Sequence, residues 1–218
     1  MYSKDVIDRF SIIATASISD ACNNVVGRRC FMDHEIKPRI NEKKVVGPAV
    51  TIQEGPSNGE VCPPTHALDA IEDCSPGDVI VIALSNSDRD VAVWGGIMTA
   101  GAYVGKMAGA VLDAGLRDIA EIRRDYDFPV FSRSISPATT LGRYKTYASR
   151  VPVVCGGVPV NNGDLIVADV DGVVCVPAEH VEAVLEASEE IEKKELEQAK
   201  LIRETGSLKK GLEKYNRI

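Results

Sequence analysis

Short apolar runs bounded by turn residues recur along this chain of 218 residues. The clearest is Val79–Leu84, which follows the turn sequence Pro76-Gly77-Asp78 and contains no polar side chain. A continuous apolar run of this length is typical of a strand that is covered on both faces. Hydrophobic residues make up 44% of the chain and aromatic residues only 5%, so Val, Ile, Ala and Leu must fill the core. Together these features predict an α/β fold.

The helices and strands are predicted from these runs and from helix-capping residues. Stretches rich in turn residues or charges, at 27–44, 53–63, 85–90 and 113–116, are expected to be loops. The expected helices are Lys4–Phe10 with Ser3 as its N-cap, a short one from Ser19 or Asp20 to Val26, Thr65 to about Cys74, Gly95 to about Ala108, Asp118–Arg124, and about Ala178 to Glu204. The expected strands are Val45–Ile52, Val79–Leu84, Val91–Trp94, Gly109–Leu112, Pro129–Phe131, Val151–Cys155, Val158–Val160, Asp164–Ala168 and Val173–Val176.

No Ser/Gly-rich linker or low-complexity stretch divides the chain, so we expect one domain over residues 1–218. The last helix, at about 178–204, has apolar residues near helical spacing in its first half and is highly charged in its second half. Two interpretations stay open for the charged half. It contacts a neighbouring subunit, or it is a plain solvated helix.

The formal net charge of −7 argues against a nucleic-acid binder, which normally carries a basic surface. The six cysteines show no paired-motif spacing, there is no signal peptide, and no apolar run is long enough to span a bilayer. We therefore expect a reduced, cytoplasmic protein without nucleic-acid or membrane partners. Two local groups of basic residues are interpreted as solvated surface: Lys37, Arg39, Lys43 and Lys44, and Arg123, Arg124 and Arg133.

Residues 95–121 contain two loops that each follow a predicted buried strand, and such strand ends commonly bind ligands in α/β folds. The first loop enters a helix at Gly95-Gly96. The free N–H groups of Ile97, Met98 and Thr99 at the start of that helix would attract an anion such as a carboxylate. Gly95, Gly96, Ile97 and Met98 are therefore candidate substrate-binding residues.

The second loop ends in Arg117-Asp118, and Glu121 follows one helical turn later. Helix capping by Asp118 is one sufficient explanation of this pattern. The same spacing would let Asp118 and Glu121 hold a hard divalent cation, directly or through water. Arg117 would supply a planar, permanently charged fork for a substrate carboxylate or enolate oxygen. These parts suit a small 2-oxo acid in which a C–C bond breaks next to a carbonyl.

The spacing of Gly96, twenty residues, Arg117-Asp118, two residues and Glu121 resembles the G-x20-R-D-x2-E/D motif of the RraA-like family. That family includes 4-hydroxy-4-methyl-2-oxoglutarate/4-carboxy-4-hydroxy-2-oxoadipate aldolases and regulators of ribonuclease E activity. The resemblance covers most of the chain. It extends over GPAVT at Gly47–Thr51, the helix at His66-Ala67, PGDV at Pro76–Val79, VLDAGLRD at Val111–Asp118, PVF at Pro129–Phe131, CGGVPV at Cys155–Val160 and GDLIVADVDGVVCVP at Gly163–Pro177.

The resemblance implies an α-β-β-α sandwich that forms homotrimers or homohexamers, with sites near the subunit interfaces. It implies that Asp118 binds Mg²⁺ or Mn²⁺ largely through water, that Arg117 contacts the oxo acid, and that the backbone at Gly96–Met98 receives the substrate carboxylate. Characterised aldolases often have Asp where this chain has Gly96, and Glu121 matches an acidic residue that compensates. A glutamate of a neighbour's C-terminal helix acts in some members, and the candidates are Glu189, Glu190, Glu192, Glu195 and Glu197.

The activity implied is that of a class II aldolase, a lyase that cleaves 2-oxo-4-hydroxy acids to pyruvate. The same enolate would allow decarboxylation of oxaloacetate. The alternative is a non-enzymatic, protein-binding regulator of ribonuclease E, but regulators of this kind can lack the Arg-Asp pair that Arg117 and Asp118 form. A menaquinone methyltransferase has no support, because no Gly-rich S-adenosylmethionine loop follows a first strand.

Three further residue patterns each allow a structural and a functional role. Cys62 and His66 have C-x3-H spacing but lack a second pair of zinc ligands, so a capped helix beginning near His66 is favoured, and a substrate contact stays open. Lys106, expected in mid-helix, is interpreted as a solvated lysine rather than as a Schiff-base former. For Asp113, support of the neighbouring site and a place in a turn are both left open.

Overall fold

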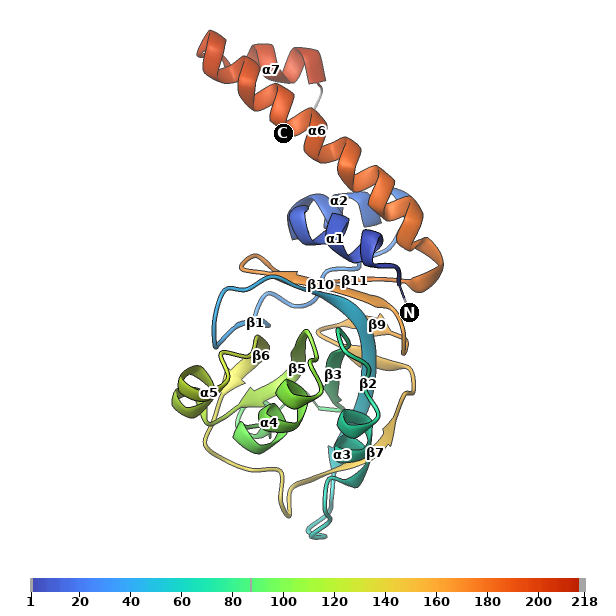
Figure 1. Ribbon diagram of the computed structural model, residues 1–218, viewed down its shortest axis with the longest axis vertical. Helices are drawn as coiled ribbons and strands as arrows, with labels where there is room; N and C mark the ends of the chain where they lie inside the picture. The colour runs from blue at the N-terminus through green and yellow to red at the C-terminus, as the bar shows by residue number, and fades with distance from the viewer. Residues whose placement is uncertain (1, 87, 216–218) are drawn as a thin grey trace.

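Nine strands of the described residues form one mixed sheet, in the order β1-β6-β5-β3-β2-β10-β11, with β4 beside β5 and β7 beside β2. Figure 1 shows the computed structural model, which describes residues 2–86 and 88–215. The strands of this sheet are β1 (Lys37–Pro38), β2 (Val45–Pro56), β3 (Val79–Leu84), β4 (Ala92–Trp94), β5 (Gly109–Leu116), β6 (Val130–Ile135), β7 (Tyr144–Ser149), β10 (Leu165–Asp169) and β11 (Gly172–Val176). A separate pair consists of β8 (Val153–Cys155) and β9 (Val158–Val160). The helices are α1 (Lys4–Ile12), α2 (Thr15–Val25), α3 (Thr65–Glu72), α4 (Gly96–Val104), α5 (Ile119–Asp125), η1 (Ala178–His180), α6 (Val181–Thr205) and α7 (Leu208–Tyr215).

The centre of the sheet is parallel, because β3 pairs in parallel with both β2 and β5, and β5 pairs in parallel with β6. The run predicted as a doubly covered strand is β3, and all six of its side chains are buried. Ile80 and Ile82 belong to one apolar cluster, whereas Val79 and Val81 belong to another on the opposite face. This is the period-two alternation of a strand that separates two layers.

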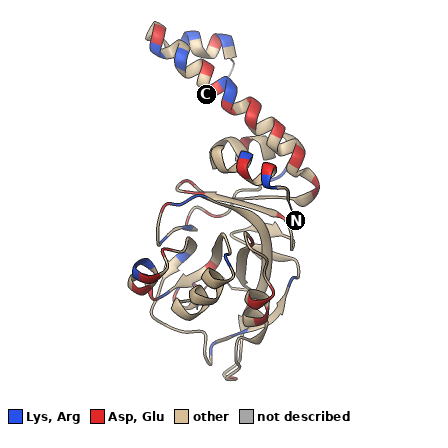
Figure 2. Cartoon of the chain, viewed as in Figure 1, with Lys and Arg blue, Asp and Glu red and all other residues tan. Residues whose placement is uncertain are grey.

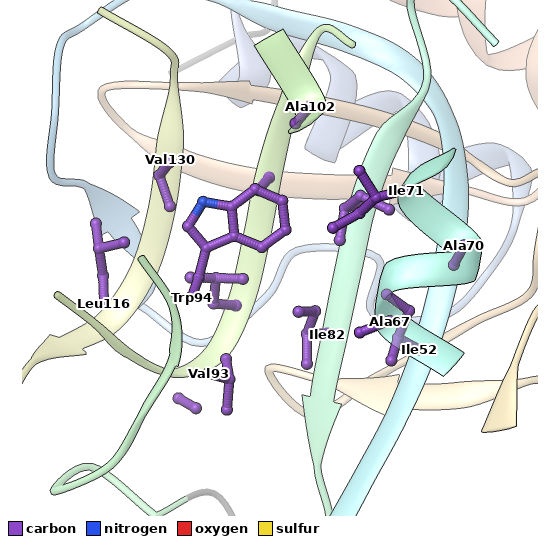
Figure 3. Close-up of a cluster of buried hydrophobic side chains, with 14 of the residues drawn as sticks. Ile52, Ala67, Ala70, Ile71, Ile82, Val93, Trp94, Ala102, Leu116 and Val130 are labelled. Carbon is purple, nitrogen blue, oxygen red and sulfur yellow. The ribbon is translucent and has the colours of Figure 1, made fainter. Parts of the chain in front are cut away.

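Helices α3, α4 and α5 lie on one side of the parallel strands, and β10 and β11 lie on the other side beneath α1, α2 and the start of α6 (Figure 1). Strand β2 connects the two parts of the sheet: Val45–Pro48 pair with β10, and Ala49–Glu54 pair with β3. Trp94 is fully buried in the cluster between the sheet and α3 and α4 (Figure 3). This layering confirms the expected α/β class and its α-β-β-α sandwich.

Tertiary pairing moves several element boundaries away from the sequence predictions. β2 continues to Pro56 through residues predicted as loop, because β7, which was not predicted, pairs alongside them. β5 continues to Leu116, because β4 pairs with it there. α2 begins at Thr15 rather than at Ser19 or Asp20, because the Asp169 carboxylate accepts hydrogen bonds from the Thr15 amide (3.0 Å) and hydroxyl (2.6 Å). A side chain distant in sequence thus supplies the missing cap.

Helix α6 projects from the rest of the molecule, and α7 folds back along its outer end (Figure 1). The buried residues of α6 lie in its first half and end at Ile191, whereas Lys, Arg and Glu are spread over its outer half (Figure 2). Gly206 adopts φ +65°, which lets the chain leave α6 and turn into α7, a helix that the sequence did not predict. No helix in the described part of the chain has the length and hydropathy needed to cross a membrane.

Candidate active site

The two loops singled out in the sequence meet at one edge of the sheet. β4 and β5 are parallel neighbours, with Trp94 opposite Leu116, so the residues that follow them leave the sheet side by side. The Arg117 amide donates to the Trp94 carbonyl at 3.0 Å and joins the two loops directly. Gly95-Gly96 and Arg117-Asp118 therefore face each other although they are about twenty residues apart in sequence.

Asp118 does not cap its own helix. It stands at the N-cap position of α5 with φ +60°, and its side chain makes no capping hydrogen bond there, so the interpretation of this carboxylate as the N-cap of α5 is wrong. Its Oδ2 atom instead accepts the amide of Gly96, the first residue of α4, at 2.9 Å, and lies 3.4 Å from Nε of Arg117. The left-handed backbone of Asp118, uncommon for a residue other than glycine, turns the carboxylate toward the other loop.

Glycine at position 95 permits this close approach. A Cβ atom built on Gly95 would lie 2.5 Å from Oδ2 of Asp118 and 3.1 Å from Cγ of Arg117. A Cβ on Gly96 would meet ordinary contacts, 3.5 Å from Oε2 of Glu121 and 3.7 Å from Oδ2 of Asp118. The carboxylates of Asp118 and Glu121 therefore both lie beside the start of α4.

The described residues around this edge line a cavity of about 130 Å³. Of the candidate site residues, Arg117, Asp118 and the segment from Gly95 to Met98 line it, whereas Glu121 borders Gly96 without lining it. The volume is far below the roughly 300–1,000 Å³ of drug-sized ligand pockets, so it suits a small molecule. The other lining residues are Glu54, Pro64, Ala92, Val93, Trp94, Thr139 and Thr140.

The amides at the start of α4 are only partly free. Thr99 donates its amide to the Gly95 carbonyl at 3.0 Å, so the expectation that this amide would serve an anion is wrong. Gly96 donates to Asp118, as described above. Ile97 and Met98 lie in the first turn, where N–H groups have no acceptor within the helix. Both residues line the cavity, so their amides remain the candidates for binding a substrate oxygen.

Sequence reasoning missed several cavity-lining side chains. Trp94 was assigned only to a strand, but its side chain lines the cavity as an apolar wall. Its indole Nε1 donates to Oγ1 of Thr99 at 2.8 Å, which fixes the ring in place. Thr139 and Thr140 come from a stretch without a predicted element. Glu54 did carry a signal, because it is an acidic residue that continues the apolar alternation of Val50 and Ile52.

The oxygen donors beside α4 fit a hard divalent cation. Mg²⁺ is commonly held by one or two carboxylates, with water and substrate oxygens completing its shell, and Asp118 and Glu121 offer two such groups. The described residues contain no cluster of three or more His, Cys, Asp or Glu side chains arranged for a metal. A cation at this position would therefore be held mostly through water and substrate.

The other sequence candidates have structural explanations. His66 is exposed on α3 and Cys62 is half-buried before it, and no third donor joins them within the described residues. Lys106 is exposed with φ 56°, and it follows α4, which ends at Val104 rather than extending past this lysine. Its mid-helix placement was therefore wrong.

Asp113 is a buried strand residue, so its place in a turn is excluded. Its carboxylate accepts Nε of Arg133 at 2.6 Å and the amide of Gly156 at 2.8 Å. The Arg133 guanidinium also pairs with Asp33 at 3.1 Å and with Glu35 at 2.5 Å, and its side chain is only 5% exposed. The interpretation of Arg133 as solvated surface was wrong, because three carboxylates hold it inside the molecule.

Comparisons with known proteins agree on one family. The family model described as RraA-like (Aldolase/RraA) matches residues 15–175. A protein of Halalkalibacterium halodurans named "Putative 4-hydroxy-4-methyl-2-oxoglutarate aldolase" is 36% identical over 186 residues, which cover 84% of this chain and 81% of that protein.

Solved structures with the same fold cover nearly the whole chain. A crystal structure of a protein from Pseudomonas syringae pv. tomato superposes with a TM-score of 0.87 at 28% identity, over 98% of this chain and 95% of that one. Streptomyces coelicolor RraAS2, described as an unusual member of the RNase ES inhibitor RraA protein family, gives 0.82 at 24% identity, over 93% and 100%. The last of these shows the fold alone. The chain belongs to the RraA-like aldolase/RraA family.

Proposed function

We propose that this protein is a divalent-metal-dependent aldolase that cleaves 2-oxo-4-hydroxy acids to pyruvate, and that the same site decarboxylates oxaloacetate. The observation that carries the proposal is the meeting of Arg117 and Asp118 with the start of α4 around one small cavity. The name of the Halalkalibacterium halodurans relative supports the same class of reaction.

Arg117 is the residue that would bind and stabilise the negative charge of the substrate. Its side chain is 39% exposed and lines the cavity, and its Nε atom is steadied by Asp118. The remaining guanidinium nitrogens form a planar fork that suits a carboxylate or an enolate oxygen. As the C–C bond breaks, charge moves onto the 2-oxo oxygen, and a fixed guanidinium stabilises it without reorganisation.

The start of α4 would orient the other end of the acid. The amides of Ile97 and Met98 and the positive end of the α4 dipole favour a carboxylate at this place. Trp94 and Val93 are buried and line the same cavity, so they reduce the access of water to the reacting carbons. A substrate held in this way would present its 2-oxo group toward Arg117.

Asp118, with Glu121 beside it, would hold the cation. When bound, Mg²⁺ or Mn²⁺ supplies Lewis-acid stabilisation of negative charge on the substrate oxygens. The hydrogen bond from the Gly96 amide keeps the Asp118 carboxylate oriented while its exposed side remains available. We further propose a homotrimer or homohexamer in which the outer half of α6 contacts a neighbouring subunit.

The test follows pyruvate release from oxaloacetate with Mg²⁺ or Mn²⁺ and with EDTA. We expect turnover that requires the cation and that is lost in Asp118→Ala. Glu60→Gln, which removes the same charge from an exposed ion pair with Lys145, should retain wild-type turnover. An inactive wild type, or full activity in Asp118→Ala, would contradict the proposal. Capture of ribonuclease E by an inactive wild type would favour the regulator instead.

A further inference from the structure

Glu54 lies near the carboxyl end of β2, opposite Leu84 at the end of β3. Its position continues the alternation of Val50 and Ile52, whose side chains join the apolar cluster that contains Trp94. Figure 3 shows Ile52, Ile82, Val93 and Trp94 around this end of the sheet. Glu54 itself lines the cavity that Arg117 and Asp118 also line. An acidic side chain thus stands where the strand pattern calls for an apolar one.

One oxygen of this buried carboxyl group has no hydrogen-bond partner in the part of the chain that the structure describes. Glu54 is 3% exposed, and within the described residues its Oε2 atom has no hydrogen-bond partner. Burial raises the pKa of Glu54 to about 7, compared with an ordinary value of 4.5. Most buried polar atoms are paired, because an unpaired one costs folding free energy. An unpaired acid beside a ligand cavity therefore calls for a functional explanation.

Glu54 borders two hollows that other charged or polar side chains also line. Arg117 and Asp118 lie in the shared small cavity. A second hollow, of about 620 Å³, borders Glu54 on another side and includes Asp113 and Tyr147. Asp113 is committed to Arg133 and Gly156, and the Tyr147 hydroxyl donates to the Pro56 carbonyl at 2.7 Å. Glu54 keeps its uncommitted oxygen atom, which distinguishes it from these neighbours.

We propose that Glu54 is the catalytic acid–base group of this site, a role that rests on the proposed aldolase function. Its carboxylate accepts the proton of the substrate 4-hydroxyl group as the C3–C4 bond breaks. The electrons of that O–H bond form the carbonyl of the departing product, and those of the C3–C4 bond form the enolate of pyruvate. Glu54 then returns the proton to C3 of the enolate, which gives pyruvate and restores the carboxylate. The cycle balances without another reactant.

Decarboxylation of oxaloacetate separates acid–base catalysis by Glu54 from the other functions of the site. Oxaloacetate loses its C4 carboxylate as CO₂ without removal of a hydroxyl proton, and the resulting enolate takes its proton from water. A base at position 54 is therefore needed for aldol cleavage but not for the loss of CO₂. General acid–base catalysis typically contributes about 10²–10⁴-fold, so its loss is measurable.

The experiment compares Glu54→Gln, Glu54→Asp and Glu60→Gln with the wild type. The substrates are 4-hydroxy-4-methyl-2-oxoglutarate and oxaloacetate, each with Mg²⁺, and pyruvate is the product measured. We expect Glu54→Gln to lower kcat for aldol cleavage by about 100-fold or more and to lower decarboxylation much less. Glu54→Asp should recover part of the aldol activity, because it restores a carboxylate. Glu60→Gln should match the wild type in both reactions.

A second measurement needs no metal and no substrate. Thermal unfolding of the metal-free wild type and of Glu54→Gln, followed between pH 5 and pH 8, reports whether a carboxyl group at position 54 is buried. A gap between the two midpoints that widens as the pH rises supports the buried acid on which the proposal depends. Midpoints that stay parallel would overturn it.

The outcomes separate the two proposals. A wild type inactive on both substrates removes the aldolase function and the role of Glu54 with it. An active wild type whose Glu54→Gln variant retains aldol cleavage overturns the role of Glu54 alone. An equal fall in both reactions also overturns it, because a damaged cavity, rather than a missing base, would then explain the loss.

Discussion

Gly95 sets the distance between the loop before α4 and the pair Arg117-Asp118. Its φ of −157° is open to any residue, so backbone conformation does not require glycine there. The requirement comes from space, because a Cβ would lie 2.5 Å from Oδ2 of Asp118. The geometry of the candidate site therefore depends on the absence of a side chain at position 95.

Gly95→Ala should fold but lose activity. The new methyl group must displace the Asp118 carboxylate and Arg117, and a shift of about 1 Å in a catalytic group can cost about 100-fold in rate. Overpacking should also lower the free energy of unfolding by about 1–3 kcal/mol. Steady-state kinetics and urea unfolding measure the two effects. Gly96→Ala, whose Cβ meets contacts of 3.5 Å or more, should lose less of both, and an equal loss would contradict the steric explanation.

Glu54 predicts an unusual dependence of stability on pH. In the unfolded chain its carboxyl loses its proton near the ordinary value of 4.5, whereas in the folded protein it keeps the proton to about pH 7. Between these values the unfolded state binds fewer protons, so this group lowers stability as the pH rises. The shift corresponds to a loss on the order of 3 kcal/mol, complete above pH 7.

The matched variant for this prediction is Glu54→Gln, which keeps the shape and removes the titration. Its free energy of unfolding should equal that of the wild type within about 1 kcal/mol near pH 4 and exceed it by roughly 3 kcal/mol at pH 8. Urea unfolding across this range measures the difference. A constant difference at all pH values would mean that Glu54 titrates normally in the folded protein.

Among the residues of the site, the sequence predicted the two loops that follow strands, but it did not predict Glu54, which lies far from them in the chain. Gly95 to Met98 and Arg117-Asp118 could be grouped because each follows a recognisable strand. The direction of the Asp118 carboxylate could not be predicted, because it depends on φ +60° and on the Gly96 amide across the cavity. Glu54 lies more than forty residues from either loop, and only the pairing of strands brings it to the same cavity.

At the scale of elements, Arg133 joins β6 to β5 and to the segment before β1. Its side chain is 5% exposed and is held by Asp113, Asp33 and Glu35, while the Asp113 side chain is 3% exposed. A buried charge that loses its partner is strongly destabilising. The network therefore stabilises the face of the sheet opposite α3, α4 and α5.

Arg133→Ala should lower the free energy of unfolding by about 3–5 kcal/mol, because Asp113 would remain buried without its cation. Chemical denaturation at neutral pH measures the change. The control is Arg89→Ala, because Arg89 pairs with the same Glu35 but is 58% exposed, and exposed pairs contribute about 0–1 kcal/mol. Similar losses in the two variants would contradict the assignment of the stability to burial.

The sequence predicted elements well where burial and local pattern coincide. β3 and β9 have the predicted bounds, and Ser3 caps α1 through the Val6 amide at 3.2 Å. β7 was missed because most of its residues are only partly buried, so it lacks an apolar pattern. The last residues of β2 were assigned to a loop because Gly, Pro and Ser signal a turn, whereas pairing with β7 keeps them extended.

At the scale of the whole molecule, the outer half of α6 with α7 forms an arm beyond the apolar clusters (Figure 1). Leu196 and Leu208 on this arm are 67% and 74% exposed. Several of the glutamates considered for a neighbour's site are engaged within their own chain, and Glu190 lies 3.3 Å from Nζ of Lys194. Glu189 accepts two hydrogen bonds from Arg9 at 2.7 Å, and Glu192 accepts the Ser17 hydroxyl at 2.8 Å. The arm beyond them remains the part best placed to meet another subunit.

A chain that ends after Lys193 tests the proposed assembly. The buried residues of α6 end at Ile191, so the truncated protein should stay folded, with an unfolding midpoint within a few degrees of the full chain. Light scattering after size-exclusion chromatography should give a homotrimer or homohexamer for the full chain and a smaller species for the truncated one. Equal numbers of subunits would show that the arm does not hold the assembly together.

In the proposed reaction, Asp118 and Arg117 act together on a small oxo acid with a divalent cation. The most direct measurement is kcat/KM for pyruvate formation from 4-hydroxy-4-methyl-2-oxoglutarate with Mg²⁺, in the wild type and in Asp118→Asn. The change keeps the shape of the side chain and removes its charge, so we predict a fall of about 100-fold or more, with an unchanged unfolding midpoint. A variant as active as the wild type would rule out this role of Asp118.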